Sequence, residues 1–328
     1  FLWQEAHTFH ATEQEAADEV ALGLEGYRSV AEDWLAIPVI RGRKSRAETF
    51  PGAVYTDAVE AMMRDRRALQ AGTSHMLGQN FARSAGIEFL DRDNLRKNPY
   101  GTSWGFSTRM VGATIMAHGD DAGLVLPPNV APHQVVVVPI FRDEEGRVAV
   151  AGAIERLEGV FAGVQTASGP LRWKVDWREE SPGFKYNHWE LRGVPYRLEI
   201  GPRDVAAGQA VLVRRTDRSK EALPLDALAA ELPGRLAAYQ AALFQRALGF
   251  RSANTHHVDT YPDFKHVLDE DGGFLMAPWC GGDECEKQIN ADTGATIRLV
   301  PFDSPDEAGT CLVDGRPSER RVLFARAY

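Results

Sequence analysis

The sequence predicts a multidomain chain that combines α/β and α+β parts, and three observations support this fold class. The chain has 328 residues, which exceeds the usual size of one domain and suggests two or three. From residue 134 onward, short apolar runs alternate with helical patterns, as in a small α/β domain. All three cysteines follow residue 279, so the C-terminal tail differs in composition from the two regions before it.

The first region opens with a strand-like segment and a helix. Thr12 and Glu15 form a capping box in front of a helical pattern that continues to Trp34. The other expected elements of this region are a strand over 37–40, a loop over 41–51, a short helix over 55–63, an apolar segment over 69–73, a strand over 104–109 and an apolar helix over 110–116.

The second region begins with residues 135–140, a continuous apolar run typical of a parallel strand that is covered on both faces. The elements expected after it are a helix that carries Ile154, Leu157, Phe161 and Val164, a strand over 171–175, a helix over 186–191, strands over 196–200 and 210–213, and a long helix from about 225 to about 252.

Composition and charge argue against several classes of function. No run approaches the roughly 20 apolar residues of a membrane helix, and no signal peptide is recognisable, so we expect no membrane partner and a cytoplasmic location. A net charge of −9 does not favour nucleic-acid binding, although an acidic protein can carry one basic face. The absence of an initiator Met suggests that the chain was cut or begins after further residues.

Two segments combine polar side chains with aromatic or small residues in a way that packing alone does not require. Strand alternation places Trp3, Glu5 and His7 on one face, where they could hold a small cation with an apolar body. In residues 70–75, small residues would let the backbone approach a ligand while neighbouring polar side chains donate to it. Alone, the first segment is equally consistent with a solvated edge strand and the second with an ordinary turn.

A third segment, residues 103–109, ends a strand at Arg109 where an apolar helix begins. Its guanidinium could bind a polyphosphate or stack on a base, although a lone arginine at a helix start is more often a surface residue.

Taken together, these segments resemble the class II aminoacyl-tRNA synthetases, and the prolyl-tRNA synthetases in particular. The resemblance covers essentially the whole chain. Its matching strings are Phe-Leu-Trp-Gln-Glu-Ala-His-Thr (1–8), Ala-Ile-Pro-Val-Ile-Arg-Gly-Arg-Lys (36–44), Gly-Thr-Ser-His-Met-Leu-Gly-Gln-Asn-Phe (72–81), Ser-Trp-Gly-Phe-Ser-Thr-Arg (103–109), His-Gly-Asp-Asp-Ala-Gly-Leu-Val-Leu-Pro-Pro (118–128) and Asn-His-Trp-Glu-Leu-Arg-Gly-Val-Pro-Tyr-Arg-Leu-Glu-Ile-Gly-Pro-Arg-Asp (187–204).

The resemblance implies three domains. Residues 1–132 would be the later part of an antiparallel-sheet class II catalytic domain, from within the second signature motif through the third. Residues 133–222 would be an α/β anticodon-binding domain, and residues 223–328 a linker helix with a small α+β domain like a zinc knuckle. The two motifs lie too close together for the editing insertion of the common bacterial form, so the chain resembles the eukaryotic and archaeal-like form.

The implied activity is a ligase reaction: ATP and Mg²⁺ activate L-proline to prolyl-adenylate, and proline passes to the 3′ end of tRNA(Pro). A homodimer is expected. The alternative is a non-catalytic synthetase-like protein that binds tRNA or a partner, and the retained site residues favour the enzyme. Threonine and histidine synthetases are disfavoured by the strings around Trp3 and His75. The first motif and parts of the second are not in this sequence, so these residues alone are not expected to catalyse activation.

The resemblance also implies residue roles. Phe1, Gln70, Thr73, Ser107 and Arg109 match positions that contact ATP, with Phe1 stacked on adenine, Gln70 near Mg²⁺, and Arg109, Gln70 and Thr73 as catalytic residues. Positions of the proline pocket are matched by Trp3, Glu5, His7, Phe50, His75 and Trp104. Positions that read the anticodon are matched by Glu190, Arg197 and Arg203, with Lys220 nearby.

The cysteines have the spacing of a structural zinc site. Cys280-x4-Cys285 is followed by Cys311-x2-Asp314, which together offer three thiolates and a carboxylate. The zinc-bearing members of the family carry a cysteine where this chain has Asp314, and an aspartate keeps the ligand charge unchanged. The alternative is a site that folds without metal. Tyr328 is expected to reach back towards the active site, as the family's terminal tyrosine does.

Overall fold

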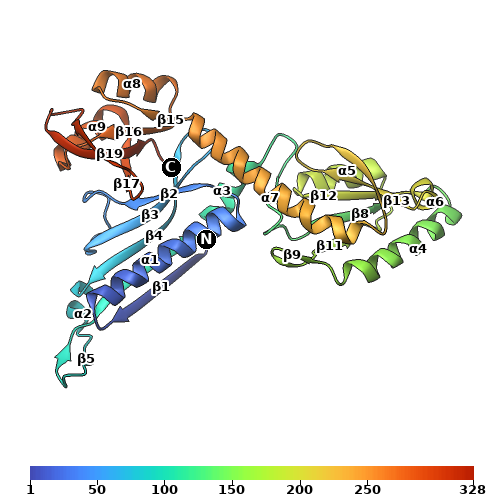
Figure 1. Ribbon diagram of the computed structural model, residues 1–328, viewed down its shortest axis with the longest axis horizontal. Coiled ribbons are helices and arrows are strands. Elements are labelled where there is room, and N and C mark those ends of the chain that lie inside the picture. Colours follow the sequence, from blue (N-terminus) through green and yellow to red (C-terminus); the bar gives the residue numbers. More distant parts are fainter. The chain divides into compact units, whose positions relative to one another are not determined.

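The computed structural model describes residues 1–328, which divide into two compact units (Figure 1). Unit 1 comprises residues 1–33, 37–113 and 247–328, and unit 2 comprises residues 34–36 and 114–246. The first and last parts of the sequence therefore share one unit. These boundaries differ from those expected at 132/133 and 222/223, and the division into three functional domains stays a prediction.

Unit 1 is built on a ten-stranded sheet with the order β1-β7-β4-β3-β2-β17-β19-β16-β15, and β18 pairs with β19. The strands from β1 to β17 pair antiparallel, as the predicted fold class requires. The strand bounds are β1 (Trp3–His10), β2 (Val39–Arg43), β3 (Tyr55–Met62), β4 (Ala68–Gly78), β7 (Tyr100–Ser107), β15 (Thr255–His257), β16 (Phe274–Pro278), β17 (Thr296–Pro301), β18 (Asp306–Thr310) and β19 (Pro317–Ala325), with a separate hairpin of β5 (Phe89–Leu90) and β6 (Arg96–Lys97).

Helix α1 (Glu13–Ser29) packs on one face of this sheet, against β4 and β7. The predicted capping box is confirmed: Glu15 N–H donates to Thr12 Oγ1, and Thr12 N–H donates to Glu15 Oε2. A π-helical segment (Val30–Trp34) follows it. The other helices that begin in unit 1 are α2 (Asn80–Ala85), α3 (Arg109–His118), α8 (Tyr261–Glu270) and α9 (Asp283–Thr293).

The prediction of a short helix over 55–63 was wrong, because this segment is strand β3. Its alanines, Glu60 and Met62 favour helix in isolation. In the fold, β3 lies between β2 and β4, and every residue from Thr56 to Met62 is buried. Burial of both faces removes the alternation by which a strand is recognised, and pairing overrides local propensity. The expected loop over 41–51 likewise begins with the last residues of β2.

A glycine lies at one point where the first and last parts of the sequence pair in unit 1. Gly42 pairs with Pro301 where β2 meets β17. A Cβ on Gly42 would lie 2.4 Å from the Val300 carbonyl oxygen, which no side chain tolerates. Because Gly42 has no side chain, β2 can pair with β17, and strands from the start and the end of the sequence form one continuous sheet.

Unit 2 is a five-stranded sheet with the order β11-β8-β12-β13-β14, in which β8 runs parallel to both neighbours. All five residues of β8 are buried, as the apolar run predicted. The bounds are β8 (Val135–Pro139), β11 (Trp173–Val175), β12 (Tyr196–Ile200), β13 (Gln209–Arg214), β14 (Lys220–Pro224), α4 (Glu144–Phe161), α5 (Pro182–Leu191), α6 (Pro202–Ala206) and α7 (Leu228–Ala253), with a small hairpin of β9 (Gln165–Thr166) and β10 (Gly169–Pro170).

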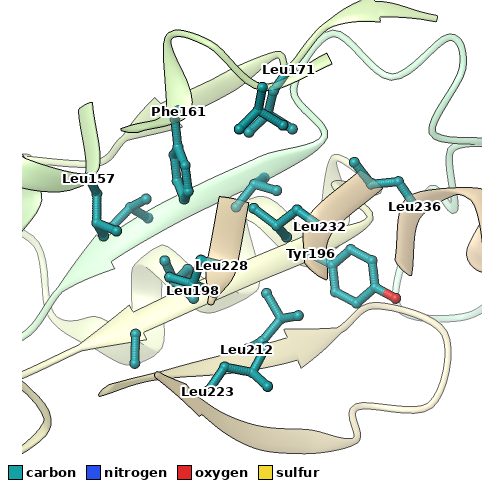
Figure 2. Close-up of a cluster of buried hydrophobic side chains, with 14 of the residues drawn as sticks. Leu157, Phe161, Leu171, Tyr196, Leu198, Leu212, Leu223, Leu228, Leu232 and Leu236 are labelled. Carbon is teal, nitrogen blue, oxygen red and sulfur yellow. The ribbon is translucent and has the colours of Figure 1, made fainter. Parts of the chain in front are cut away.

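The core of unit 2 lies between this sheet, α4 and α7 (Figure 2). Phe161 from α4, Leu198 from β12 and Leu232 from α7 converge there with almost no exposure. Burial of such a side chain contributes about 1.5–3 kcal/mol. No helix of either unit combines the length and apolar character needed to cross a bilayer.

Candidate functional site

The sheet of unit 1 has a partly exposed face opposite α1 over β1, β7 and the middle of β4, which we call the open face. Strand β1 pairs with β7 so that Glu5 lies opposite Gly105 and His7 opposite Ser103. Strand β4 pairs with the other edge of β7. There Thr73 lies opposite Gly105, and His75 lies opposite Ser103. Because cross-strand partners point to the same side, Glu5, His7, Thr73 and His75 share one face.

The β1 side chains of this face are exposed. Glu5 Oε2 and His7 Nε2 lie 3.9 Å apart, and more than half of each side chain is accessible. Phe1 stands edge-on to Trp3 with 5.6 Å between ring centroids, and both rings are largely exposed. The predicted trio of Trp3, Glu5 and His7 therefore offers aromatic surface and a carboxylate to a ligand.

His75 is held on the same face by two neighbours. Its Nδ1 lies 2.8 Å from Thr56 Oγ1, and the Phe50 ring lies 5.0 Å from its ring centroid. Partial burial lowers the pKa of His75 to about 4, so its imidazole is neutral at physiological pH. Thr56 was not predicted as a site residue, because it lies in the segment that was expected to be helical.

Trp104 does not lie on this face with the other residues matched to the proline pocket, and its implied role stays a prediction. Its cross-strand partner is Ser74, so its side chain points to the α1 face of the sheet. There it meets Tyr27 edge-on at 5.7 Å. A Cβ on Gly23 of α1 would lie 2.8 Å from the Trp104 ring, so the helix and the indole are in tight contact.

Four of the residues expected to contact ATP, Phe1, Gln70, Ser107 and Arg109, lie near the point where β1 begins and β7 ends. Arg109, the first residue of α3, is exposed and donates from Nη1 to the Gln70 carbonyl across 3.3 Å. Its own N–H donates to Ser107 Oγ across 3.3 Å. Thr108 N–H donates to the Leu2 carbonyl at 3.0 Å, which ties this corner to the segment that carries Phe1. A guanidinium and an exposed aromatic ring are thus presented together.

A second polar cluster lies in unit 2, at β12. Arg197 donates from Nη1 to Glu190 at 3.3 Å and from Nε to Glu199 at 3.0 Å. Its guanidinium carbon lies 4.0 Å from the centroid of the Tyr186 ring. Lys220 Nζ lies 3.2 Å from Glu199 Oε2. Burial, followed by the charge of Glu199, raises the pKa of Tyr186 to about 12.

Three of the four predicted anticodon residues are thus connected: Arg197 bonds Glu190 directly, and Glu199 links Arg197 to Lys220. The fourth, Arg203, lies on α6, is exposed and forms no side-chain hydrogen bond or ion pair. Tyr186 and Glu199 were not predicted. Spacing could have found both, because Glu199 follows Arg197 by two strand residues and Tyr186 precedes Glu190 by one helical turn.

The predicted metal ligands come together in unit 1. One ligand atom from each of Cys280, Cys285, Cys311 and Asp314 lies within 4.8 Å of all the others. Cys280 Sγ is 3.6 Å from Cys285 Sγ, and the Asp314 carboxylate is 3.1 Å from Cys285 Sγ. Tetrahedral Zn²⁺ with bonds of about 2.3 Å holds its sulfur ligands about 3.8 Å apart, so the spacing fits this ion.

Electrostatics in this cluster favour a cation. The pKa of the Cys285 thiol is raised by burial and by the neighbouring Asp314 carboxylate. Hydrogen bonds from Cys285 and from the Arg316 N–H lower the pKa of Asp314. Arg316 also donates from Nη2 to Cys280 Sγ at 3.1 Å and from Nε to Asp314. This guanidinium supplies one positive charge at the edge of a set that carries four negative charges when the thiols ionise.

Two models of known protein families match parts of this chain. The family model "Prolyl-tRNA synthetase, C-terminal" matches residues 261–328, and the model "Anticodon binding domain" matches residues 134–235. The second range contains the Arg197 cluster, and the first contains the four candidate metal ligands.

Whole-chain relatives extend the match to the open face of unit 1. The chain is 48% identical to a proline–tRNA ligase of Roseiflexus castenholzii and 49% identical to one of Chloroflexus aggregans, in each case over all of this chain and 68% of the relative. A crystal structure of prolyl-tRNA synthetase from Cryptosporidium parvum, complexed with L-proline and AMP, is 36% identical with a TM-score of 0.91. The match covers all of this chain and 70% of that one.

Proposed function

This chain belongs to the prolyl-tRNA synthetase family, the ligases that join proline to its tRNA, and we propose how its residues share that reaction. A proline carboxylate oxygen attacks the α-phosphorus of ATP, which releases pyrophosphate and forms prolyl-adenylate. A 3′-terminal hydroxyl of tRNA(Pro) then attacks the adenylate carbonyl and releases AMP. No covalent enzyme intermediate is needed, so the residues act by positioning and by charge.

The proline pocket is assigned to the open face of unit 1. The observation that supports it most directly is that Glu5 and His75, which lie far apart in sequence, face the same side of the sheet. The Trp3 and Phe50 rings would pack the pyrrolidine ring, and the Glu5 carboxylate would accept hydrogen bonds from the charged amine. His7 borders this carboxylate. Trp104 supports the pocket from behind through α1.

The ATP site is assigned to the corner formed by Phe1, Gln70, Ser107 and Arg109, with Thr73 further along β4. The exposed Arg109 guanidinium would neutralise phosphate charge, and the Phe1 ring would stack on adenine. Gln70 offers an amide oxygen, the kind of ligand that Mg²⁺ accepts. Bound Mg²⁺ would supply further neutralisation of the phosphates.

The anticodon site is assigned to the Arg197 cluster of unit 2. Arginine matches the acceptor edge of guanine, and a carboxylate accepts from guanine N1 and N2. Glu190 and Glu199 already hold Arg197, which leaves its remaining N–H groups in a fixed direction. The exposed Arg203 and the half-exposed Lys220 would contact the RNA backbone.

We assign a structural Zn²⁺ to Cys280, Cys285, Cys311 and Asp314. The fit of the ligand spacing and the hydrogen bonds from Arg316 support this assignment. Its role would be to hold together the fold of the C-terminal segment. The homodimer and the cytoplasmic location stay predictions.

Two substitutions in the full-length protein separate the proposed sites. Glu5→Gln should suppress proline-dependent ATP–pyrophosphate exchange and aminoacylation together, because both need the bound amine. Glu190→Gln should leave exchange near the wild-type rate and suppress aminoacylation of tRNA(Pro). The division of roles is wrong if Glu190→Gln abolishes exchange in a folded protein, or if Glu5→Gln leaves the KM for proline unchanged.

A further inference from the structure

The hydroxyl of Thr56 connects the backbone to the imidazole of His75. Only 1% of Thr56 is exposed, so its hydroxyl must find partners within the protein. Two atoms lie in hydrogen-bond reach: the Phe50 N–H, which donates to Oγ1 across 3.1 Å, and His75 Nδ1 at 2.8 Å. The other imidazole nitrogen, Nε2, has no partner in the chain and is not among the buried unpaired atoms, so it is available to a ligand.

These contacts determine where the imidazole proton lies. A threonine hydroxyl has one hydrogen to donate and two lone pairs to accept. The backbone N–H of Phe50 is always a donor, so it occupies one lone pair. The hydroxyl hydrogen then has one acceptor in reach, His75 Nδ1. If Nδ1 carried the proton instead, the buried hydroxyl hydrogen would have no acceptor, which costs about 1–3 kcal/mol.

The imidazole carries one proton only. Burial lowers the pKa of His75 to about 4, so the doubly protonated form is rare at neutral pH. A neutral imidazole that accepts at one nitrogen donates at the other. With Nδ1 as the acceptor, Nε2 is the N–H that faces the ligand.

We propose that Thr56 is a positioning residue that fixes His75 as the Nε2–H tautomer, so that His75 offers the amino acid a hydrogen-bond donor. This inference rests on the proposed proline pocket. The proline ammonium carries donors only, and a second donor cannot pair with it. His75 therefore binds an oxygen of the proline carboxylate or of the adenylate carbonyl, and Glu5 is left as the partner of the amine.

The arrangement makes the pocket complementary to a zwitterion in one orientation. The acceptor, Glu5, lies on β1, and the donor, His75, lies on β4, with β7 between them. A proline turned end for end would set ammonium against N–H and carboxylate against carboxylate, and both pairs repel. Since Phe50 donates to Thr56 and its ring packs on His75, the same hydrogen bonds also hold the proposed aromatic wall.

The tautomer is measured directly by long-range ¹H–¹⁵N correlation NMR on the ¹⁵N-histidine-labelled full-length protein, with His75→Gln to assign the signals. We expect a protonated Nε2 and an unprotonated Nδ1 in the wild type and in Thr56→Ser. Protonated Nδ1 in the wild type overturns the proposal, whether or not any variant folds. This readout does not depend on activity, so it is separate from a failure of the proposed function, which would appear as exchange that proline does not stimulate.

Kinetics test the consequence for proline. Thr56→Val keeps the shape of the side chain and removes the hydroxyl, and it should raise the KM for proline about tenfold while the KM for ATP stays unchanged. Thr56→Ser keeps the hydroxyl and should restore the wild-type KM. An unchanged proline KM in folded Thr56→Val overturns the proposal, and so does a Thr56→Ser protein as impaired as Thr56→Val. His75→Gln combined with Thr56→Val should be no worse than His75→Gln alone.

Discussion

The ammonium of Lys44 donates to the carboxylate of Glu60 across 2.8 Å, and both side chains are almost fully buried. Arg298 donates to the same carboxylate from Nη2 at 2.8 Å. Burial lowers the pKa of Lys44, and the charge of Glu60 opposes that shift. One carboxylate therefore holds two buried cations, one from the start and one from the end of the sequence.

Glu60→Ala should destabilise unit 1 strongly, because it leaves both cations buried without a partner. The expected loss in the free energy of unfolding is about 3–5 kcal/mol, measured by urea denaturation. Glu25→Ala is the matched control. Its carboxylate pairs with Arg28 and Arg41 on the surface, so removal should cost about 1 kcal/mol or less. Equal losses in the two variants would contradict the buried network.

Trp104 should contribute to stability more than to substrate binding. Trp104→Ala removes the contact with Tyr27 and with Gly23 of α1, and should cost about 3 kcal/mol in the free energy of unfolding. Trp104→Phe should stay close to wild type in both stability and proline KM, because the indole N–H has no partner to lose. A Trp104→Ala protein of wild-type stability with a greatly raised proline KM would instead place this side chain in the pocket.

His75 should make stability depend on pH below neutrality. Its pKa is about 4 in the folded chain, because of burial, and about 6.5 when unfolded. Between these values the unfolded state binds more protons, so stability is complete above about pH 6.5 and falls as the pH drops towards 4. His118, whose pKa burial also lowers to about 4, acts in the same direction.

The measurement compares urea denaturation at pH 7 and pH 5. Wild type should lose more stability over this interval than His75→Gln, which lacks the titrating group. A His75→Gln protein with an unchanged pH dependence would show that the imidazole titrates normally in the fold.

The four-residue metal set should hold one Zn²⁺ per chain. Asp314→Cys should retain the metal, since thiolates are preferred ligands, whereas Asp314→Ala should lose it and become more sensitive to proteolysis after residue 279. Elemental analysis after dialysis measures the content. Asp306→Ala is the control, because that exposed carboxylate pairs only with Arg320. Metal-free wild type with an intact C-terminal fold would favour the alternative in which Arg316 alone supplies the positive charge.

Local signals in the sequence were sufficient for several elements. The capping box at Thr12 and the apolar run over 135–140 predicted a helix and a buried strand that the structure confirms. Strand β3 was missed because burial of both faces leaves no alternation to read. The placement of Trp3, Glu5 and His7 on one face of a strand could be predicted from the alternation of side chains alone.

Contacts that depend on how the strands pair could not be predicted from the sequence. Thr56 meets His75 because β3 and β4 pair in one particular register, and nothing in either segment reports that register. The orientation of Trp104 depends in the same way on its partner, Ser74. Glu199 could have been identified from its spacing to Arg197, but its contact with Lys220 depends on the pairing of β12, β13 and β14.

Whether this family member activates proline is measured by ATP–pyrophosphate exchange with the full-length protein, assayed against each amino acid in turn. Exchange should depend on proline, and Arg109→Ala should reduce it by at least about a hundredfold because phosphate charge is no longer neutralised. Exchange stimulated by a different amino acid, or none from a folded wild-type protein, would contradict the assignment of proline as the substrate.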